Sequence, residues 1–266
     1  MNYLNIDSLN GEAGGWSNYQ WTSGSGVSLD LSGESYVVLR DGIDGFSGGT
    51  GEASSEASPN LMRSVVRQTT FAPREFGFDV LIRGKDHSDL MQKRQILLDA
   101  FSHGDGVLRK TIPGVGVVSI TARSVRGYPD IRNGLPPGAQ AKTQVVTIRL
   151  VAHDPYFYGP VLRQNAVGNI CTVENTGNAE LTPCRIKLSA NTCTNTTTGQ
   201  VMTARGGQTV TGCIVDIKDT GVAAELDGAN VLGRFTYDSQ FPMLISGTNV
   251  ISGAEWVEFM PRWGGV

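Results

Sequence analysis

Four cysteines are the residues of this chain that most suggest a metal site or redox chemistry, but their spacing does not support a shared site. All of them fall in the second half of the 266-residue sequence, at Cys171, Cys184, Cys193 and Cys213. A structural zinc site usually brings two ligands together in a tight C-x₂₋₄-C turn, and cytosolic thiols stay reduced. We therefore expect no metal site and no disulfide, and interpret the cysteines as small buried hydrophobic side chains on strands.

Signals for catalysis are equally weak. The pair His153-Asp154 stands before Pro155, and a strand end followed by a turn accounts for it without acid–base chemistry. The glycine-rich run 45–51 lacks the Lys-Ser/Thr pair of a phosphate loop and does not connect a strand to an expected helix. We predict a protein that is not an enzyme, with no catalytic, metal-binding or cofactor-binding residues and no cofactor.

One amphipathic helix is the clearest structural signal in the sequence. In DHSDLMQKRQILLDAFSHG, apolar residues recur at helical spacing, which predicts a helix over about 88–103. Either Asp86 or Ser88 can cap its start, and Gly104 can supply a left-handed residue after its end. The expected packing face consists of Leu90, Leu97, Leu98 and Phe101.

Strand-like runs surround this helix. FGFDVLIRG precedes it, GDGVLRKTIPGVGVVSITARSVRG holds two β-rich runs around a Pro-Gly turn, and TQVVTIRLVAHDPYFYGP ends a strand at a proline. Together with 34 glycines and many short β-branched runs, this predicts a mainly β protein with one helix. A length of 266 residues is more than the usual ~100–200 residues of one domain, so we expect two.

We place the first domain at 1–160, a short linker at about 161–170, where VLRQNAVGN is weakly patterned, and the second domain at 171–266. Within the first domain, the run 41–60 is rich in Gly, Ser and Ala and has almost nothing to bury. Such a composition predicts a long mobile loop that is either disordered or used for contact.

The order of a helix, GDGVLRKTIPG and a long strand ending in LVAHDPYFYGP resembles the distal tail protein of long-tailed, siphovirus-type bacteriophages. In that family the protein is the hub that joins the tail tube to the host-binding tip. Downstream, VENTGNAELTPCRIKLSA, NTTTGQVM and FPMLISGTNVI resemble the second domain of the family. The resemblance covers the chain from about Phe71 onward, while residues before Asp41 match only in order and spacing.

This resemblance implies a fold and a set of partners. The first domain would be a ring-forming, tail-tube-like β-sandwich or split barrel with one α-helix, and the second a galectin-like β-sandwich. A hexameric ring of this virion protein would sit in the phage tail tip after assembly in the host cytoplasm. The implied partners are the tail tube protein, the tail-associated tip protein and receptor-binding or baseplate proteins, with the tape measure protein as a further candidate.

Charge is distributed unevenly along the expected first domain. Residues 1–60 hold eight acidic residues and one basic residue, whereas residues 61–132 hold seven acidic and twelve basic residues. In a head-to-tail ring, each subunit can set the acids of one side against the bases of its neighbour. The alternative is that both charged surfaces are solvated. The candidate inter-subunit residues are Asp41, Asp44, Glu52, Glu56, Arg109, Lys110, Arg123 and Arg126.

A carbohydrate-binding module is the main alternative function, because β-sandwiches often carry sugars on an aromatic face. The candidate sugar-facing residues are Tyr237, Trp256 and Trp263, although a core position explains Trp256 more simply. Nucleic-acid binding fits poorly, since the chain has a net charge of −3 and no Lys/Arg tract. In a tail hub, DNA would be a passenger through the channel.

No apolar run approaches the ~20 residues that a membrane span needs. The sequence MNYLNIDSLNG has neither the basic n-region nor the apolar h-region of a signal peptide. We therefore expect synthesis in the cytosol and no membrane partner.

Overall fold

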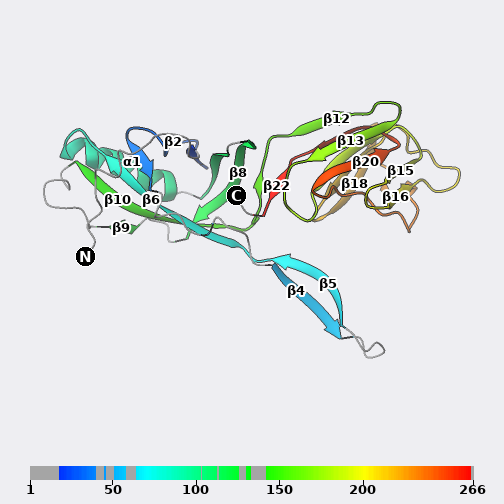
Figure 1. Cartoon of the computed structure of the whole chain (residues 1–266), viewed down its shortest axis with the longest axis horizontal. Coiled ribbons are helices and arrows are strands. Elements are labelled where there is room, and N and C mark those ends of the chain that lie inside the picture. Colours follow the sequence, from blue (N-terminus) through cyan, green and yellow to red (C-terminus); the bar gives the residue numbers. More distant parts are fainter. Residues whose placement is uncertain are drawn as a thin grey trace. The chain divides into compact units, whose positions relative to one another are not determined.

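The computed structural model divides the chain into two compact units. The first unit comprises Met1–Phe157 and Gly264–Val266, and the second comprises Tyr158–Trp263. The described part is mostly β-strand with a single α-helix, as the sequence predicted (Figure 1). The structure describes residues 18–39, 45, 51–57, 64–102, 104–112, 114–125, 130–132 and 142–264, with only the backbone described for 51–57, 64–71 and 130–132.

The first unit is built on one antiparallel sheet in the order β2-β1-β7-β8-β10-β6-β3, with β9 paired to β10. The backbone N–H of Val38 donates to the carbonyl of Leu31 at 2.9 Å, so the segments at the two edges meet and the sheet almost closes into a barrel. The strands are β1 (Tyr19–Ser23), β2 (Ser28–Asp30), β3 (Tyr36–Val38), β6 (Arg74–Arg83), β7 (Asp105–Ile112), β8 (Gly116–Ser124), β9 (Asp130–Arg132) and β10 (Thr143–Ala152).

Strand β6 is buried on both faces, which explains its nearly continuous apolar sequence. On one face, Phe76 and Phe78 are buried, and Phe78 contacts Phe101 of the helix. On the other face, Leu81 packs in a small cluster with Leu39 and Val145.

The helix α1 (His87–Ser102) begins and ends where the sequence predicted, to within a residue. The Asp86 carboxylate accepts the N–H of Asp89 at 2.9 Å and so caps the first turn. After the last turn, Gly104 has φ +68°, the left-handed conformation that a glycine adopts without strain. On the face toward the sheet, the helix buries Leu90, Leu97, Ala100 and Phe101, while Leu98 is half-buried.

Aromatic rings join α1 to the sheet. Trp21 of β1 stacks on Phe101 with ring centroids 4.5 Å apart, and its indole N–H donates to the Ala100 carbonyl at 2.8 Å. Phe78 of β6 meets Phe101 edge to face at 6.3 Å. A Cβ on Gly106 of β7 would lie 2.2 Å from the Trp21 ring, so glycine is needed where the strand passes under the indole.

The expectation of a long loop over 41–60 is wrong for part of that segment. Strand β4 (Gly51–Ala57) pairs antiparallel with β5 (Ser64–Phe71) in a separate two-stranded sheet. Composition could not show this, because backbone hydrogen bonding to a downstream partner makes the strand and needs few apolar side chains. Apart from Gly45, the rest of 41–60 lies outside the described residues.

The second unit consists of two antiparallel sheets that share one core. Their orders are β12-β21-β14-β17-β18-β19 and β13-β20-β15-β16. Alternate side chains of strands in both sheets enter the same cluster of small aliphatic side chains and thiols, as in a β-sandwich. The strands are β12 (Leu162–Asn165), β13 (Ile170–Asn175), β14 (Cys184–Leu188), β15 (Thr192–Asn195), β16 (Gln200–Thr203), β17 (Ile214–Lys218), β18 (Gly221–Leu226), β19 (Ala229–Asn230), β20 (Gly247–Ser252) and β21 (Ala254–Phe259). The shorter elements are the 3₁₀ turn η4 (Leu232–Arg234), β22 (Arg262–Trp263) and β11 (Phe157–Tyr158), which spans the boundary between the units.

The segment 161–170, expected as a linker, belongs to the second unit. It contains β12, whose residue Arg163 pairs with Glu258 of β21, and the first residue of β13. All four side chains of β12 are exposed because it is an edge strand, and this explains why its sequence lacks an apolar pattern.

Buried asparagines hold the turns of the second unit. Asn249 is completely buried, and its amide N–H groups donate to the carbonyls of Ile245 at 2.8 Å and Gly247 at 3.1 Å. Its carbonyl oxygen accepts the Ile245 N–H at 3.1 Å and the amide of buried Asn195 at 3.3 Å. These contacts satisfy the polar atoms of the buried Asn249 amide and tie the turn at Ile245 and Gly247 to the interior.

Candidate functional site

Two predicted inter-subunit residues, Arg109 and Lys110, lie on β7 of the first unit, and each contacts a residue of the neighbouring strand β1. The Arg109 guanidinium donates to the Thr22 hydroxyl at 2.9 Å. The Lys110 ammonium lies 5.8 Å from the centre of the Tyr19 ring, and burial lowers the pKa of Lys110. Both side chains are half-buried, so they combine a structural contact with a charge near the surface.

Arg123 of β8 forms an ion pair within the chain. Its Nε donates to Asp105 Oδ1 at 2.8 Å, and both side chains are 56% exposed. Such an exposed pair is weak and can exchange partners. The remaining predicted residues cannot be placed in the same way: Asp41, Asp44 and Arg126 lie outside the described residues, and the side chains of Glu52 and Glu56 on β4 are not described.

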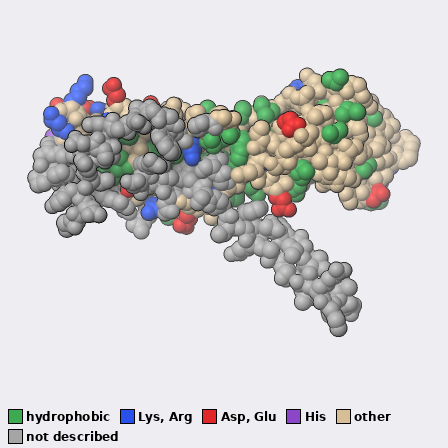
Figure 2. Space-filling model, viewed as in Figure 1, with side chains coloured by type: hydrophobic (Ala, Val, Ile, Leu, Met, Phe, Trp, Pro, Cys, Tyr) green, Lys and Arg blue, Asp and Glu red, His purple; other side chains and the backbone are tan. Residues whose placement is uncertain are grey.

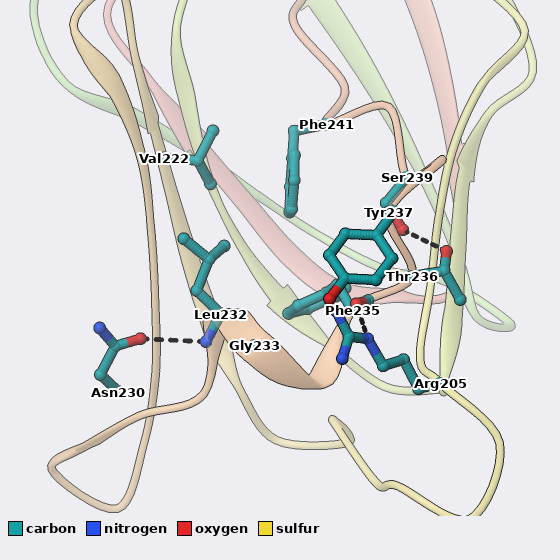
Figure 3. Close-up of a pocket in the computed structure, with 10 residues that line it drawn as sticks. All are labelled: Arg205, Val222, Asn230, Leu232, Gly233, Phe235, Thr236, Tyr237, Ser239 and Phe241. Atoms are coloured by element: carbon teal, nitrogen blue, oxygen red, sulfur yellow. Dashed lines mark hydrogen bonds between the residues drawn. The ribbon is translucent and has the colours of Figure 1, made fainter.

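The second unit has an open hollow of about 720 Å³ between β18, η4 and the segment that follows η4 (Figure 3). Its apolar lining includes Phe235, which is 3% exposed, and Phe241, whose ring meets Phe235 edge to face at 5.4 Å. Asn230 stands at the other side, and its carbonyl oxygen accepts the Leu232 N–H at 3.0 Å.

Tyr237 lines this hollow and is 95% exposed. The Arg205 guanidinium lies 4.1 Å from the centre of its ring, a cation–π contact that Figure 3 shows beside the hollow. Nε of Arg205 donates to the Phe235 carbonyl at 2.8 Å, which fixes the guanidinium in place.

A hydrogen-bonded turn holds Tyr237. The Ser239 N–H donates to the Thr236 carbonyl at 3.2 Å, and the two hydroxyls lie 2.9 Å apart. Thr203 of β16 accepts the Thr236 N–H at 2.9 Å and donates its own N–H to the Ser239 hydroxyl at 3.0 Å. A hydrogen bond from Thr236 lowers the pKa of the adjacent Asp238 carboxyl. The exposed tyrosine therefore stands on a well-anchored turn.

The other two predicted sugar-facing residues are 6% exposed each. The Arg163 guanidinium covers the Trp256 ring at 4.1 Å. The Trp263 ring packs on Gly159, where an added Cβ would lie 3.0 Å from it. Both indoles lie within the fold and leave little ring surface for a ligand, so Tyr237 alone presents an open ring among the three.

Sequence reasoning missed Arg205 as the partner of Tyr237. The two residues are far apart in the chain, and the contacts between Thr203 and the turn after η4 bring them together. The sequence offered one signal, an aromatic residue between polar turn formers in FTYDSQF.

The thiols of the second unit do not form a reactive site. All four cysteines are free and buried; Cys184 lies on β14 as the sequence predicted, whereas Cys213 lies directly before β17. Burial raises the pKa of Cys193 to about 12 and raises that of Cys184 as well, so both stay protonated at neutral pH. Among the described residues, no group of three or more His, Cys, Asp or Glu side chains is placed to hold a metal ion. No helix in the described part is long and apolar enough to span a membrane.

Known proteins resemble this chain in structure and not in sequence. No family model matches it, and no curated protein sequence matches it significantly. The crystal structure of the SPP1 Dit (gp 19.1) protein, described as a paradigm of the hub adsorption apparatus in phages that infect Gram-positive hosts, aligns with a TM-score of 0.55 and 17% identity. That alignment covers 92% of this chain and 98% of SPP1 Dit.

Two structures of the phage P2 baseplate in its activated conformation align more distantly. With Ca, the TM-score is 0.43 at 8% identity, over 94% of this chain and 99% of the baseplate chain. With Sr, the TM-score is 0.42 at 9% identity, over 93% and 98%. The likeness to SPP1 Dit shows that this chain shares the fold of a phage hub protein.

Proposed function

We propose that this protein is a structural component of a phage virion, the distal tail hub that joins the tail tube to the tip. The observation that supports the proposal is the agreement in fold with SPP1 Dit over 92% of this chain. An alignment of that extent includes both compact units in one chain order, which a single common β-domain would not provide.

In this function the first unit forms a ring, six subunits by resemblance, that continues the tail tube of a siphovirus-type phage. The second unit, a galectin-like sandwich, is a docking platform for tip, receptor-binding or baseplate proteins. The basic strands β7 and β8 meet acidic side chains of the neighbouring subunit, and DNA passes through the ring without being held. The protein acts as a scaffold in the tail tip and not as an enzyme.

Electron microscopy and light scattering of the purified full chain test this proposal. We expect annular particles in negative stain and a scattering mass of several subunits. The ring should weaken as ionic strength rises from about 0.05 M to 0.5 M, because charge pairs are screened over a Debye length of ~10 Å at 0.1 M. A monomer at every concentration and salt level would contradict the ring.

A pair of variants tests the charged interface. Replacing Arg109 and Lys110 of β7 by Gln should shift ring dissociation to lower salt. Replacing Arg185 and Lys187 of β14, whose ion pairs lie on the second unit, is the matched control and should leave dissociation unchanged. Equal behaviour of the two variants would mean that apolar packing or strand pairing joins the subunits.

Carbohydrate binding by the second unit remains a second candidate function. A specific observation favours it: Tyr237 is 95% exposed and lies beside a hollow with an apolar lining. Binding of this kind would add host-wall recognition to the hub and does not depend on ring formation.

A further inference from the structure

In the second unit, two arginines each stack on an aromatic ring at the same distance, but one ring is buried and the other is exposed. In each pair the guanidinium lies 4.1 Å from the ring centre. Arg163 covers Trp256, which is 6% exposed, so that pair closes the surface over the core. Arg205 lies on Tyr237, which is 95% exposed, so that pair buries almost none of the tyrosine.

A role in folding does not explain the second pair. Single exposed apolar side chains are ordinary on protein surfaces. Tyr237 differs because its turn is anchored to β16 by several hydrogen bonds and because a fixed cation lies on its ring. Holding an exposed ring in one place lowers the entropy cost of binding a ligand against it.

The charge at this site is available to a ligand. Nε of Arg205 donates to the Phe235 carbonyl, and among the described residues no acidic side chain forms an ion pair with Arg205. The nearest acid in sequence to the tyrosine, Asp238, is hydrogen-bonded to Thr236. The two terminal nitrogens of a guanidinium form a fork that matches a carboxylate or a phosphate.

The hollow supplies further contacts. Its lining includes the half-buried, apolar side chains of Phe241 and Leu232, which suit the C–H face of a sugar ring. The carbonyl oxygen of Asn230 is engaged by the Leu232 N–H, so the amide is oriented and its N–H₂ group can donate to a ligand hydroxyl. On the face that Figure 2 shows, the second unit carries few charged side chains.

We propose that this hollow binds an anionic saccharide, with Tyr237 against the sugar ring and Arg205 on its carboxylate or phosphate group. The inference rests on the second candidate function and is independent of the ring. Two sources could supply such a ligand: sugars that carry a carboxylate, and wall polymers in which sugars are joined or decorated by phosphate. The site recognises the chemistry that they share.

Titration calorimetry with the full chain tests the proposal, using trigalacturonate, glucose 1-phosphate and neutral maltotriose as probes. At least one charged probe should bind, and maltotriose should bind at least about tenfold more weakly, since a charge-assisted hydrogen bond contributes ~1.5–3 kcal/mol. Preference for trigalacturonate would indicate the carboxylate source, and preference for glucose 1-phosphate the phosphate source. Equal binding of the neutral probe, or no binding of any probe at millimolar concentration, would overturn the proposal.

Variants assign the binding to this hollow. Tyr237→Ala and Arg205→Gln should each weaken binding of the charged probe about tenfold or more, whereas Tyr237→Phe keeps the ring and should restore it. Arg185→Gln, which removes an exposed arginine elsewhere on this unit, should have no effect. If Tyr237→Ala and Arg205→Gln bind as the parent does, the hollow is not the site.

Negative-stain images of the same samples separate the two proposals. Rings without saccharide binding would overturn this inference and leave the hub intact. Saccharide binding by a protein that forms no ring would support this inference and contradict the hub.

Discussion

The largest fully buried side chains of the first unit are aromatic, whereas the core of the second unit consists mainly of small aliphatic side chains and thiols. In the first unit, Trp21, Phe78 and Phe101 gather between one helix and a curled sheet. In the second unit, two sheets meet over short side chains, and buried polar groups such as Asn249 hold the turns in place. The difference lies in the size of the buried side chains, because interior hydrogen bonds occur in both units, such as that from the Trp21 indole N–H to the Ala100 carbonyl in the first.

The largest effect should come from the helix of the first unit. Leu97 is completely buried, so Leu97→Ala should lower the free energy of unfolding of this unit by ~2–5 kcal/mol through lost burial and a cavity. The neighbouring Ile96 is 46% exposed, and Ile96→Ala is the matched control with little expected effect. Chemical denaturation, with hydrogen exchange as the probe of each unit, measures the free energy of unfolding of both variants. If Leu97→Ala unfolds at the same denaturant concentration as the parent, α1 does not depend on this face.

The next effect should come from an ion pair in the second unit. The Arg262 side chain is 4% exposed and donates to both carboxylate oxygens of Asp219, at 2.6 and 3.2 Å. Burial opposes the charge of Arg262, but the hydrogen bonds and charges of Asp219 and Tyr158 together outweigh burial and raise the pKa of Arg262. Asp219→Ala should therefore cost ~1.5–3 kcal/mol in the second unit.

The control for that ion pair is Lys218→Ala. The Lys218 side chain is 64% exposed and forms an ion pair with Asp216, which the substitution removes. Exposed pairs contribute at most ~1 kcal/mol, so this variant should unfold almost as the parent does. Equal losses in Asp219→Ala and Lys218→Ala would mean that burial of Arg262 adds nothing to the pair.

A somewhat smaller effect should follow from the buried amide. Asn249→Ala strands the N–H and carbonyl of Ile245, and an unsatisfied buried group costs ~1–3 kcal/mol. Thermal unfolding of the second unit should shift down. Thr248→Ala, beside it on the exposed side of β20, loses only a hydrogen bond to Glu174 and serves as the control. An unchanged melting temperature in Asn249→Ala would mean that these hydrogen bonds add nothing to the stability of the second unit.

The smallest effect concerns acid stability of the first unit. The Lys85 N–H and then Lys93 hydrogen-bond Asp89 and lower its pKa below the usual value. A folded-state pKa below that of the unfolded chain stabilises the fold above the unfolded pKa of about 3.9, and this contribution is lost as pH falls through the folded pKa.

Asp89→Asn removes that titration. Between pH about 6 and 3, the first unit of the variant should therefore lose less stability than that of the parent, as measured by hydrogen exchange. The second unit should show the same pH dependence in both proteins. A steeper acid loss in the variant would mean that the sign of this contribution is wrong.

Elements that depend on local spacing could be predicted from the order of the residues alone. The helix, its cap at Asp86 and the left-handed Gly104 follow from the properties of residues that are neighbours in the chain. The mainly β class follows in the same way from short β-branched runs and turn residues, and the apolar patterns in PCRIKL and GCIVDI predict the burial of Cys184 and Cys213.

Features that depend on a partner far away in the chain could not be predicted and became visible in the folded protein. Strand β4 forms because it pairs with β5, and β12 forms because it pairs with β21 at the edge of the sheet. In the same way, Trp256 is covered by Arg163, while Tyr237 stands open beside Arg205. Burial and backbone pairing are properties of contacts across the fold, and no local pattern specifies which side of a sheet or which cation an aromatic ring will meet.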